Sequence, residues 1–299
     1  MLNVADCLSS HTLLPRQCDV VNQGSRDPLN MPELPEVETT RAGIEPHLVD
    51  RTITAVTVRE NRLRWPVSPE LSQMATGQTI VSVARRAKYL LIGLRRGFVM
   101  IHLGMSGSLR ILAQETAPQR HDHFDMMLDS GVILRYRDPR RFGSIFWLDQ
   151  LSHRLLDQLG PEPLGEDFDG TTLFKASRGK ARNVKTLIMD AGVVVGVGNI
   201  YANEALYLAG IRPTQPAGKI TIKRYHRLAD AIKSVLEKAI AAGGTSLRDF
   251  LKEDGKPGYF RHALKVYDRA GEPCLGCHKP LSSVRITGRA TVFCKRCQR

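Results

Sequence analysis

Four of the six cysteines of this 299-residue chain crowd its C-terminal end, as Cys274, Cys277, Cys294 and Cys297. Their C-x2-C-x16-C-x2-C spacing is typical of a four-thiolate zinc site, in which each pair fills two corners of a tetrahedron. Two disulfides are the alternative, but residues 1–30 lack the pattern of a secretory signal, so we expect a reducing compartment. The sequence therefore predicts one structural Zn²⁺ ion. The remaining cysteines, Cys7 and Cys18, have no partner spacing.

The charge of the chain is unevenly distributed. Its 43 Lys and Arg against 30 Asp and Glu give a net charge of +13, and residues 171–299 hold 24 basic against 9 acidic residues. A basic half of this kind predicts a polyanionic partner such as nucleic acid, although a solvated basic surface has the same composition. Hydrophobic residues make up 42% of the chain, which indicates a globular protein, and no apolar run is long enough for a membrane span.

Short strands follow an N-terminal helix, and helices follow the strands. Pro35 suits the first turn of a helix that would end near Leu48. Regularly spaced β-branched and apolar runs then predict a β-sandwich or barrel, over residues 52–58, 80–83, 89–94, 98–103, 124–128, 132–136 and 144–148. Helical spacing returns after a Pro- and Gly-rich linker, over residues 171–177, 183–189, 198–209 and 222–242.

Four separated motifs together resemble the bacterial formamidopyrimidine-DNA glycosylases. Pro32-Glu33-Leu34-Pro35-Glu36-Val37-Glu38 is similar to the N-terminus of that family, and Asp138–Gly143 resembles its void-filling loop. Val195–Ala202 resembles its helix–two-turn–helix motif, and the four cysteines resemble its zinc finger. The resemblance covers residues 31–299 and preserves the order of the motifs.

The resemblance implies an α+β multidomain fold. We expect an extension at 1–31 that is absent from the mature enzyme, a helix plus β-sandwich catalytic domain at 32–150, and a linker at 151–165. A helix–two-turn–helix DNA-binding domain at 166–262 and a zinc-finger hairpin at 263–299 would complete the chain.

The function that the resemblance implies is base-excision repair. The enzyme would remove oxidised purines, such as 8-oxoguanine and formamidopyrimidines, from double-stranded DNA and then cut the abasic strand by β,δ-elimination. It would thus be both a glycosidase (hydrolase) and a lyase, and we expect a cytoplasmic, nucleoid-associated monomer with no membrane partner. A relative of endonuclease VIII, which prefers oxidised pyrimidines, is the nearest alternative, and a non-catalytic DNA-binding module is another.

The catalytic residues follow from the first motif. Once Met31 is removed, Pro32 would offer a terminal secondary amine that can attack the sugar and form an iminium intermediate. Glu33 matches the catalytic acid of the family, and Glu36 has either a catalytic or a structural role. Without the other motifs, Pro32 and both glutamates would be interpreted as an ordinary helix start. The 31 preceding residues would turn the amine of Pro32 into an amide, which favours the non-catalytic alternative.

The remaining matches concern DNA. Lys88 and Arg289 match catalytic positions that contact phosphate near the lesion, although a basic cluster such as the one around Lys88 is often a solvated surface. Further DNA-binding positions of the family match His102, His121, Arg140, Asn199 and Tyr259. Three residues match those that fill the duplex after the damaged base leaves, which are Met105, Arg140 and Phe142. Met105 and Phe142 would otherwise be interpreted as core residues.

Overall fold

The computed structural model describes residues 32–114, 116–244 and 263–299. Its first element is α1 (Leu34–Leu48), with Pro35 in the first turn as the sequence predicts. A carboxylate oxygen of Glu36 accepts the backbone N–H of Glu33 at 2.9 Å and so caps the helix. The buried side of α1 carries Val37, Ile44 and Leu48, which are at most 1% exposed.

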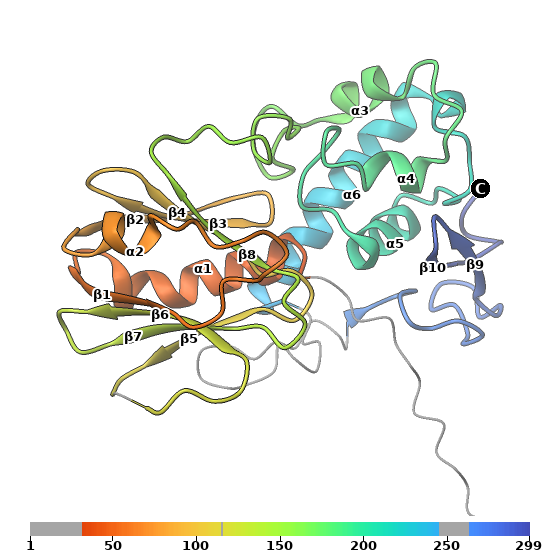
Figure 1. Cartoon of the computed structure of the whole chain (residues 1–299). Helices are drawn as coiled ribbons and strands as arrows, with labels where there is room; N and C mark the ends of the chain where they lie inside the picture. The colour runs from red at the N-terminus through yellow and green to blue at the C-terminus, as the bar shows by residue number, and fades with distance from the viewer. Residues whose placement is uncertain (1–31, 115, 245–262) are drawn as a thin grey trace, which may run out of the picture.

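Two four-stranded antiparallel sheets enclose α1, which lies between them (Figure 1). The strands of one sheet run in the order β1 (Ile53–Val58), β6 (Asp122–Leu128), β7 (Ile133–Arg137) and β5 (Ser108–Leu112). The strands of the other run in the order β2 (Ile80–Arg86), β3 (Tyr89–Leu94), β4 (Phe98–His102) and β8 (Ser144–Leu148). A short helix, α2 (Leu71–Ala75), joins the same hydrophobic core. The predicted β-sandwich is confirmed, with the N-terminal helix inside it.

Strand β5 is the element of this half that the sequence analysis missed, together with the short α2. It pairs with β7, so that Leu109 lies opposite Tyr136. The strand is only five residues long and lies at the sheet edge. Its identity therefore depends on the partner strand more than on a pattern of its own.

Helices make up the next part of the chain. They are α3 (Gly170–Ser177), α4 (Val184–Ile188), α5 (Asn199–Leu208), the 3₁₀ turn η1 (Ala217–Lys219) and α6 (Ile222–Ala241). Side chains cap two of them: Asp169 accepts the N–H of Thr172 at 2.8 Å, and Asn183 accepts that of Thr186 at 2.9 Å. Helix α6 extends from this bundle toward α1, where the two helices are in contact (Figure 1). None of the helices in the ranges described is long and apolar enough to cross a membrane.

The chain ends in a hairpin of β9 (Ser282–Ile286) and β10 (Arg289–Phe293), which packs beside α5 (Figure 1). The segment that leads into it is held by Glu204 of α5, which is 4% exposed. The Glu204 carboxylate accepts three consecutive backbone N–H groups, from residues 265, 266 and 267, at 2.8–2.9 Å. A single buried side chain thereby fixes the entry to the C-terminal hairpin.

The linker between the two halves is bonded to the sandwich. Glu162 accepts hydrogen bonds from the guanidinium groups of Arg85 and Arg86 at 2.8 and 3.1 Å, and from the N–H of Ala87 at 2.7 Å. Arg86 also donates to the carbonyls of residues 159 and 160. These contacts hold the β2–β3 turn, which carries Lys88, against the linker.

Candidate active site

The carboxylate of Glu33 lies where the two halves of the molecule meet. Glu33 is 2% exposed, and its oxygens accept the backbone N–H groups of Gly198 at 2.7 Å and Ile200 at 2.9 Å, with Tyr201 N–H farther away at 3.4 Å. These donors form the N-terminus of α5, whose unpaired N–H groups and dipole favour an anion. A β-carbon at Gly198 would overlap the Glu33 carboxyl group, so glycine is required there.

The surroundings of Glu33 give it an unusual protonation equilibrium. Burial raises the pKa of Glu33 from 4.5 to about 7, against the opposing effect of Lys88 and the helix N–H groups. Burial also lowers the pKa of Lys88, while the nearby Glu33 raises it. A carboxyl group with a pKa near neutrality can donate a proton at physiological pH.

Glu36 has a structural position beside this carboxyl group. It is fully buried, and one oxygen accepts the Tyr201 hydroxyl at 2.6 Å while the other caps α1 through the N–H of Glu33. Glu36 thus joins the first turn of α1 to α5. Of the two roles that the sequence left open, these contacts favour the structural one.

A cavity of about 200 Å³ adjoins the turn of Gly198, whose N–H bonds Glu33, although neither Pro32 nor Glu33 lines it. Its walls come from the β2–β3 turn, from β4, from the glycine-rich turn before α5 and from the C-terminal hairpin, and they include Lys88, His102, Gly198 and Arg289. Three residues that the sequence assigned to DNA contacts, Lys88, His102 and Arg289, therefore meet around one opening, although they are far apart along the chain. Their donors and the adjacent carboxyl group can bind a phosphodiester and protonate a neighbouring group.

His102 is neutral at physiological pH. Burial and the positive charges of Lys88 and Arg64 lower the pKa of His102 to about 4. Its Nδ1 accepts the N–H of Gly104 at 3.1 Å, so the neutral ring carries its proton on Nε2. That N–H group can act as a donor without adding a charge.

Lys185 is a buried residue of the site region that the sequence analysis missed. It is 1% exposed, and its ammonium group donates to the Asn199 side-chain oxygen at 2.6 Å, to Thr291 Oγ1 at 2.7 Å and to the carbonyl of Ala290 at 3.2 Å. Burial lowers the pKa of Lys185 to about 7, with Glu33 opposing. Lys185 therefore joins α4, α5 and β10. The sequence feature that could have identified Lys185 is the presence of a lysine among the apolar residues of the short helix α4.

The three residues matched to duplex insertion lie on two neighbouring turns. Met105 is partly exposed in the turn between β4 and β5, and Phe142 is 41% exposed in the turn before β8. The Arg140 guanidinium carbon lies 4.6 Å from the centre of the Phe142 ring. Phe142 is thus not a core residue. His121 lies beside this turn, where its carbonyl accepts the N–H of Asp138 at 3.1 Å, and Tyr259 falls outside the described residues.

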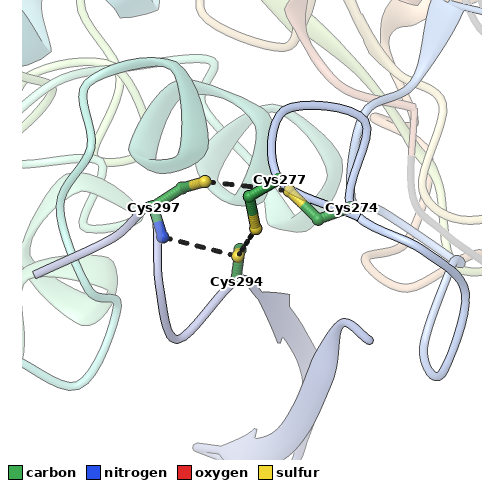
Figure 2. A group of neighbouring side chains, drawn as sticks. All are labelled: Cys274, Cys277, Cys294 and Cys297. Carbon is green, nitrogen blue, oxygen red and sulfur yellow. Dashed lines mark hydrogen bonds between the residues drawn. The ribbon is translucent and has the colours of Figure 1, made fainter. Parts of the chain in front are cut away.

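The four C-terminal cysteines form one cluster (Figure 2). Their sulfur atoms all lie within 4.8 Å of one another, at 3.9 Å for Cys274–Cys297 and 3.4 Å for Cys277–Cys294. These separations exceed the roughly 2.05 Å of a disulfide bond, so the cysteines are free thiols. Helix α5 supports the cluster through the Tyr207 hydroxyl, which lies 3.3 Å from the sulfur of Cys274.

Comparison with protein families gives two matches in chain order. Residues 31–145 match the formamidopyrimidine-DNA glycosylase N-terminal domain, and residues 159–251 match the formamidopyrimidine-DNA glycosylase H2TH domain. A formamidopyrimidine-DNA glycosylase of Stutzerimonas stutzeri (strain A1501) is 56% identical over 270 residues, which are 90% of this chain and 100% of the relative.

Solved structures of complexes with DNA share the fold. A complex between Lactococcus lactis Fpg and DNA containing an abasic site has a TM-score of 0.82 and 32% identity, over 89% of this chain and 99% of that one. A structure of MutM with DNA containing carbocyclic 8-oxo-G has a TM-score of 0.82 and 33% identity, over 90% and 100% of the two chains.

Substitution of Lys185 tests the link between the hairpin and the helices. Lys185→Met keeps the apolar stem but leaves the oxygens of Asn199 and Thr291 without their donor, at a cost of about 1–3 kcal/mol. We expect hydrogen exchange at the N–H groups of β10 to accelerate accordingly, while Lys175→Met, at an exposed position of α3, leaves it unchanged. Equal exchange in both variants would contradict the linking role.

Proposed function

Because this chain belongs to the formamidopyrimidine-DNA glycosylase family, we propose that it excises oxidised purines from duplex DNA with Pro32 as nucleophile and Glu33 as acid. It is a base-excision repair DNA glycosylase of a family with abasic-site lyase activity, and its substrate is damaged DNA. The observation that carries the residue assignment is the buried Glu33 carboxyl group, which has a pKa of about 7, follows Pro32 in the chain and bonds the N–H of Gly198 in the cavity wall.

The nucleophile would be the amine of Pro32 in a chain that begins at this residue. The N-terminal family match starts at residue 31, and the Stutzerimonas relative aligns over its whole length with 90% of the chain, which supports that start. The neutral amine would attack C1′ of the damaged nucleotide and displace the base, forming an iminium ion. The iminium would acidify the adjacent sugar proton, so that β- and then δ-elimination release the two phosphates.

Glu33 would supply the proton that opens the sugar ring. Its carboxyl group is held by the N-terminus of α5 next to the nucleophile in sequence, and about half of it is protonated near pH 7. A general acid acts best when its pKa lies near the working pH. This balance arises from burial, with Lys88 and the helix N–H groups limiting the rise of the pKa.

The basic residues around the cavity would hold the DNA backbone. Lys88 and Arg289 would contact phosphates beside the extruded nucleotide, and the Nε2–H group of His102 would contribute a neutral donor. Asn199, His121 and Tyr259 are proposed as further DNA contacts on the family resemblance. The shared cavity wall supports the first three assignments.

Met105, Arg140 and Phe142 would enter the duplex once the damaged base has left the stack. Phe142 would wedge a base step, Met105 would fill the vacated space and Arg140 would bond the orphaned base. The exposure of Phe142 and its contact with the Arg140 guanidinium support these roles.

One Zn²⁺ ion would be held by Cys274, Cys277, Cys294 and Cys297. A tetrahedral site with Zn–S bonds of about 2.3 Å places its sulfurs about 3.8 Å apart, and the observed separations of 3.4 and 3.9 Å are compatible with that geometry. With four thiolate ligands the site is closed, so the ion would be structural and would hold the hairpin that presents Arg289.

Borohydride trapping tests the nucleophile. The form that begins at Pro32 has a free amine, so reduction of its iminium should link it covalently to 8-oxoguanine DNA. The 299-residue form should not be trapped, and neither should a matched form with a single alanine before Pro32, because both have an amide there. Trapping of all three forms with equal efficiency would refute the assignment.

The pH dependence of excision tests the acid. Glu33 must be protonated to act, so single-turnover excision should fall as pH rises through about 7. Glu33→Gln should lower the rate by about 10²–10⁴-fold and remove this descending limb, whereas cleavage of a preformed abasic site should suffer less. Glu45→Gln, on the exposed part of α1, is the control. A descending limb that survives in Glu33→Gln would assign the acid elsewhere.

Metal removal tests whether a structural Zn²⁺ ion in the C-terminal hairpin supports DNA binding. Chelation of Zn²⁺, or Cys294→Ser, should weaken binding of a lesion-containing duplex by about tenfold or more, the effect of losing a charged contact such as that of Arg289. Restoring Zn²⁺ to the chelated protein should restore the dissociation constant. A dissociation constant that is the same with and without metal would contradict a structural site.

A further inference from the structure

Asp138 is a buried carboxylate that bonds both turns carrying the insertion residues. It is fully buried at the end of β7. One oxygen accepts the Ser106 hydroxyl at 2.5 Å and the N–H of Arg140 at 3.3 Å. The other accepts the Tyr136 hydroxyl at 3.1 Å and the N–H of Gly143 at 2.8 Å. Ser106 follows Met105 directly, so one side chain joins the turn of Met105 to the turn of Arg140 and Phe142.

The two turns interlock closely around this carboxylate. Ser106 Oγ also accepts the N–H of Arg140 at 3.1 Å. A β-carbon at Gly143 would overlap the Tyr136 hydroxyl, and one at Gly104 would overlap the backbone of residue 142. The turns therefore have little freedom to move independently of each other.

Within the described ranges, the four groups that bond the Asp138 side-chain oxygens are all donors. Burial and the Asp138 charge raise the pKa of Tyr136 well above its usual value, so its hydroxyl keeps its proton. An asparagine at 138 would present an NH₂ group to at least one of these donors. The arrangement thus requires a carboxylate, although the residue has no contact with solvent.

The same turns are bonded to the wall of the cavity. His102, which lines the cavity, accepts the N–H of Gly104 at 3.1 Å, and a β-carbon at Gly143 would lie close to the His102 carbonyl. The turns are therefore packed against one residue of the cavity wall as well as against each other.

We propose that Asp138 is a positioning residue that presents Met105, Arg140 and Phe142 to the duplex as one preformed unit. The inference rests on the insertion roles proposed above. A preformed unit avoids the entropy cost of ordering two separate turns while the DNA is being opened. Loss of the carboxylate would leave the chemistry of Pro32 and Glu33 intact but impair the exchange of the damaged base for protein side chains.

The test compares a substrate that needs insertion with one that does not. Asp138→Asn should excise 8-oxoguanine from duplex DNA about tenfold to a hundredfold more slowly under single-turnover, saturating conditions, the range expected for a lost charged hydrogen bond. Cleavage of an abasic site in single-stranded DNA, which has no opposing base, should stay within about twofold of the parental rate. Both rates are measured where circular dichroism shows the variant to be folded.

Asp125→Asn is the matched control. Asp125 is a buried carboxylate of the neighbouring strand, 3% exposed, whose bonds go to Arg59 and Arg135 and not to the insertion turns. It should leave the ratio of the two rates unchanged. If Asp138→Asn does not fold, Ser106→Ala removes only the hydroxyl that joins the turns and should lower the same ratio.

Arg140→Ala separates failure of this inference from failure of the insertion role. If Arg140→Ala slows duplex excision and Asp138→Asn does not, the insertion role stands and the positioning role of Asp138 is wrong. Equal losses on both substrates in Asp138→Asn would show a general structural effect and overturn the inference. A parental rate of duplex excision for Arg140→Ala would overturn the insertion role and, with it, the inference.

Discussion

The bond between the Glu33 carboxylate and the N-terminus of α5 is the contact on which the rest of the site depends. It joins the first residues of the sandwich domain to the helical domain through donors at 2.7 and 2.9 Å. The Glu33 carboxylate completes the N-terminus of α5, whose N–H groups would otherwise be buried without partners. One interaction therefore orders the domain interface and holds Glu33 against the turn of Gly198, which lines the cavity. Burial at this interface raises the pKa of Glu33 to about 7, and the same N–H groups limit the rise.

Helix α5 also holds the C-terminal hairpin in place through three of its side chains. Asn203 accepts the N–H of Val292 at 3.0 Å, Glu204 holds the segment before the hairpin, and Tyr207 contacts Cys274. The hairpin then brings Arg289 to the cavity that Lys88 also lines. A ten-residue helix thus contacts the Glu33 carboxylate, the C-terminal hairpin and the cysteine cluster. Through α5 the four clustered cysteines are therefore connected to the residues around Glu33 and the cavity.

Local patterns in the sequence predicted most of the fold and part of the site. The cysteine spacing, the proline at the start of α1 and the short β-branched and apolar runs of the strands each depend on neighbouring residues, so they can be recognised along the chain. The helix predicted over residues 222–242 is observed at Ile222–Ala241. Strand β5 was missed because its pairing with β7 defines it. Lys185 was missed because its partners lie on other elements. The linking role of Asp138 was missed because it depends on Ser106, which lies in a different turn.

The sequence by itself determined which chemical groups are present: an N-terminal proline motif, acids beside it, four thiols at metal-binding spacing and a basic C-terminal half. Only the tertiary structure decided the environment and the hydrogen-bond partners of each group. Glu33 and Glu36 are equivalent acids at a helix start, yet one lies at the N-terminus of α5 beside Lys88, and the other bonds Tyr201 and caps α1. The physical reason is that burial and the orientation of distant donors set the pKa and the hydrogen bonding of a carboxyl group, and both arise only when the two domains pack together.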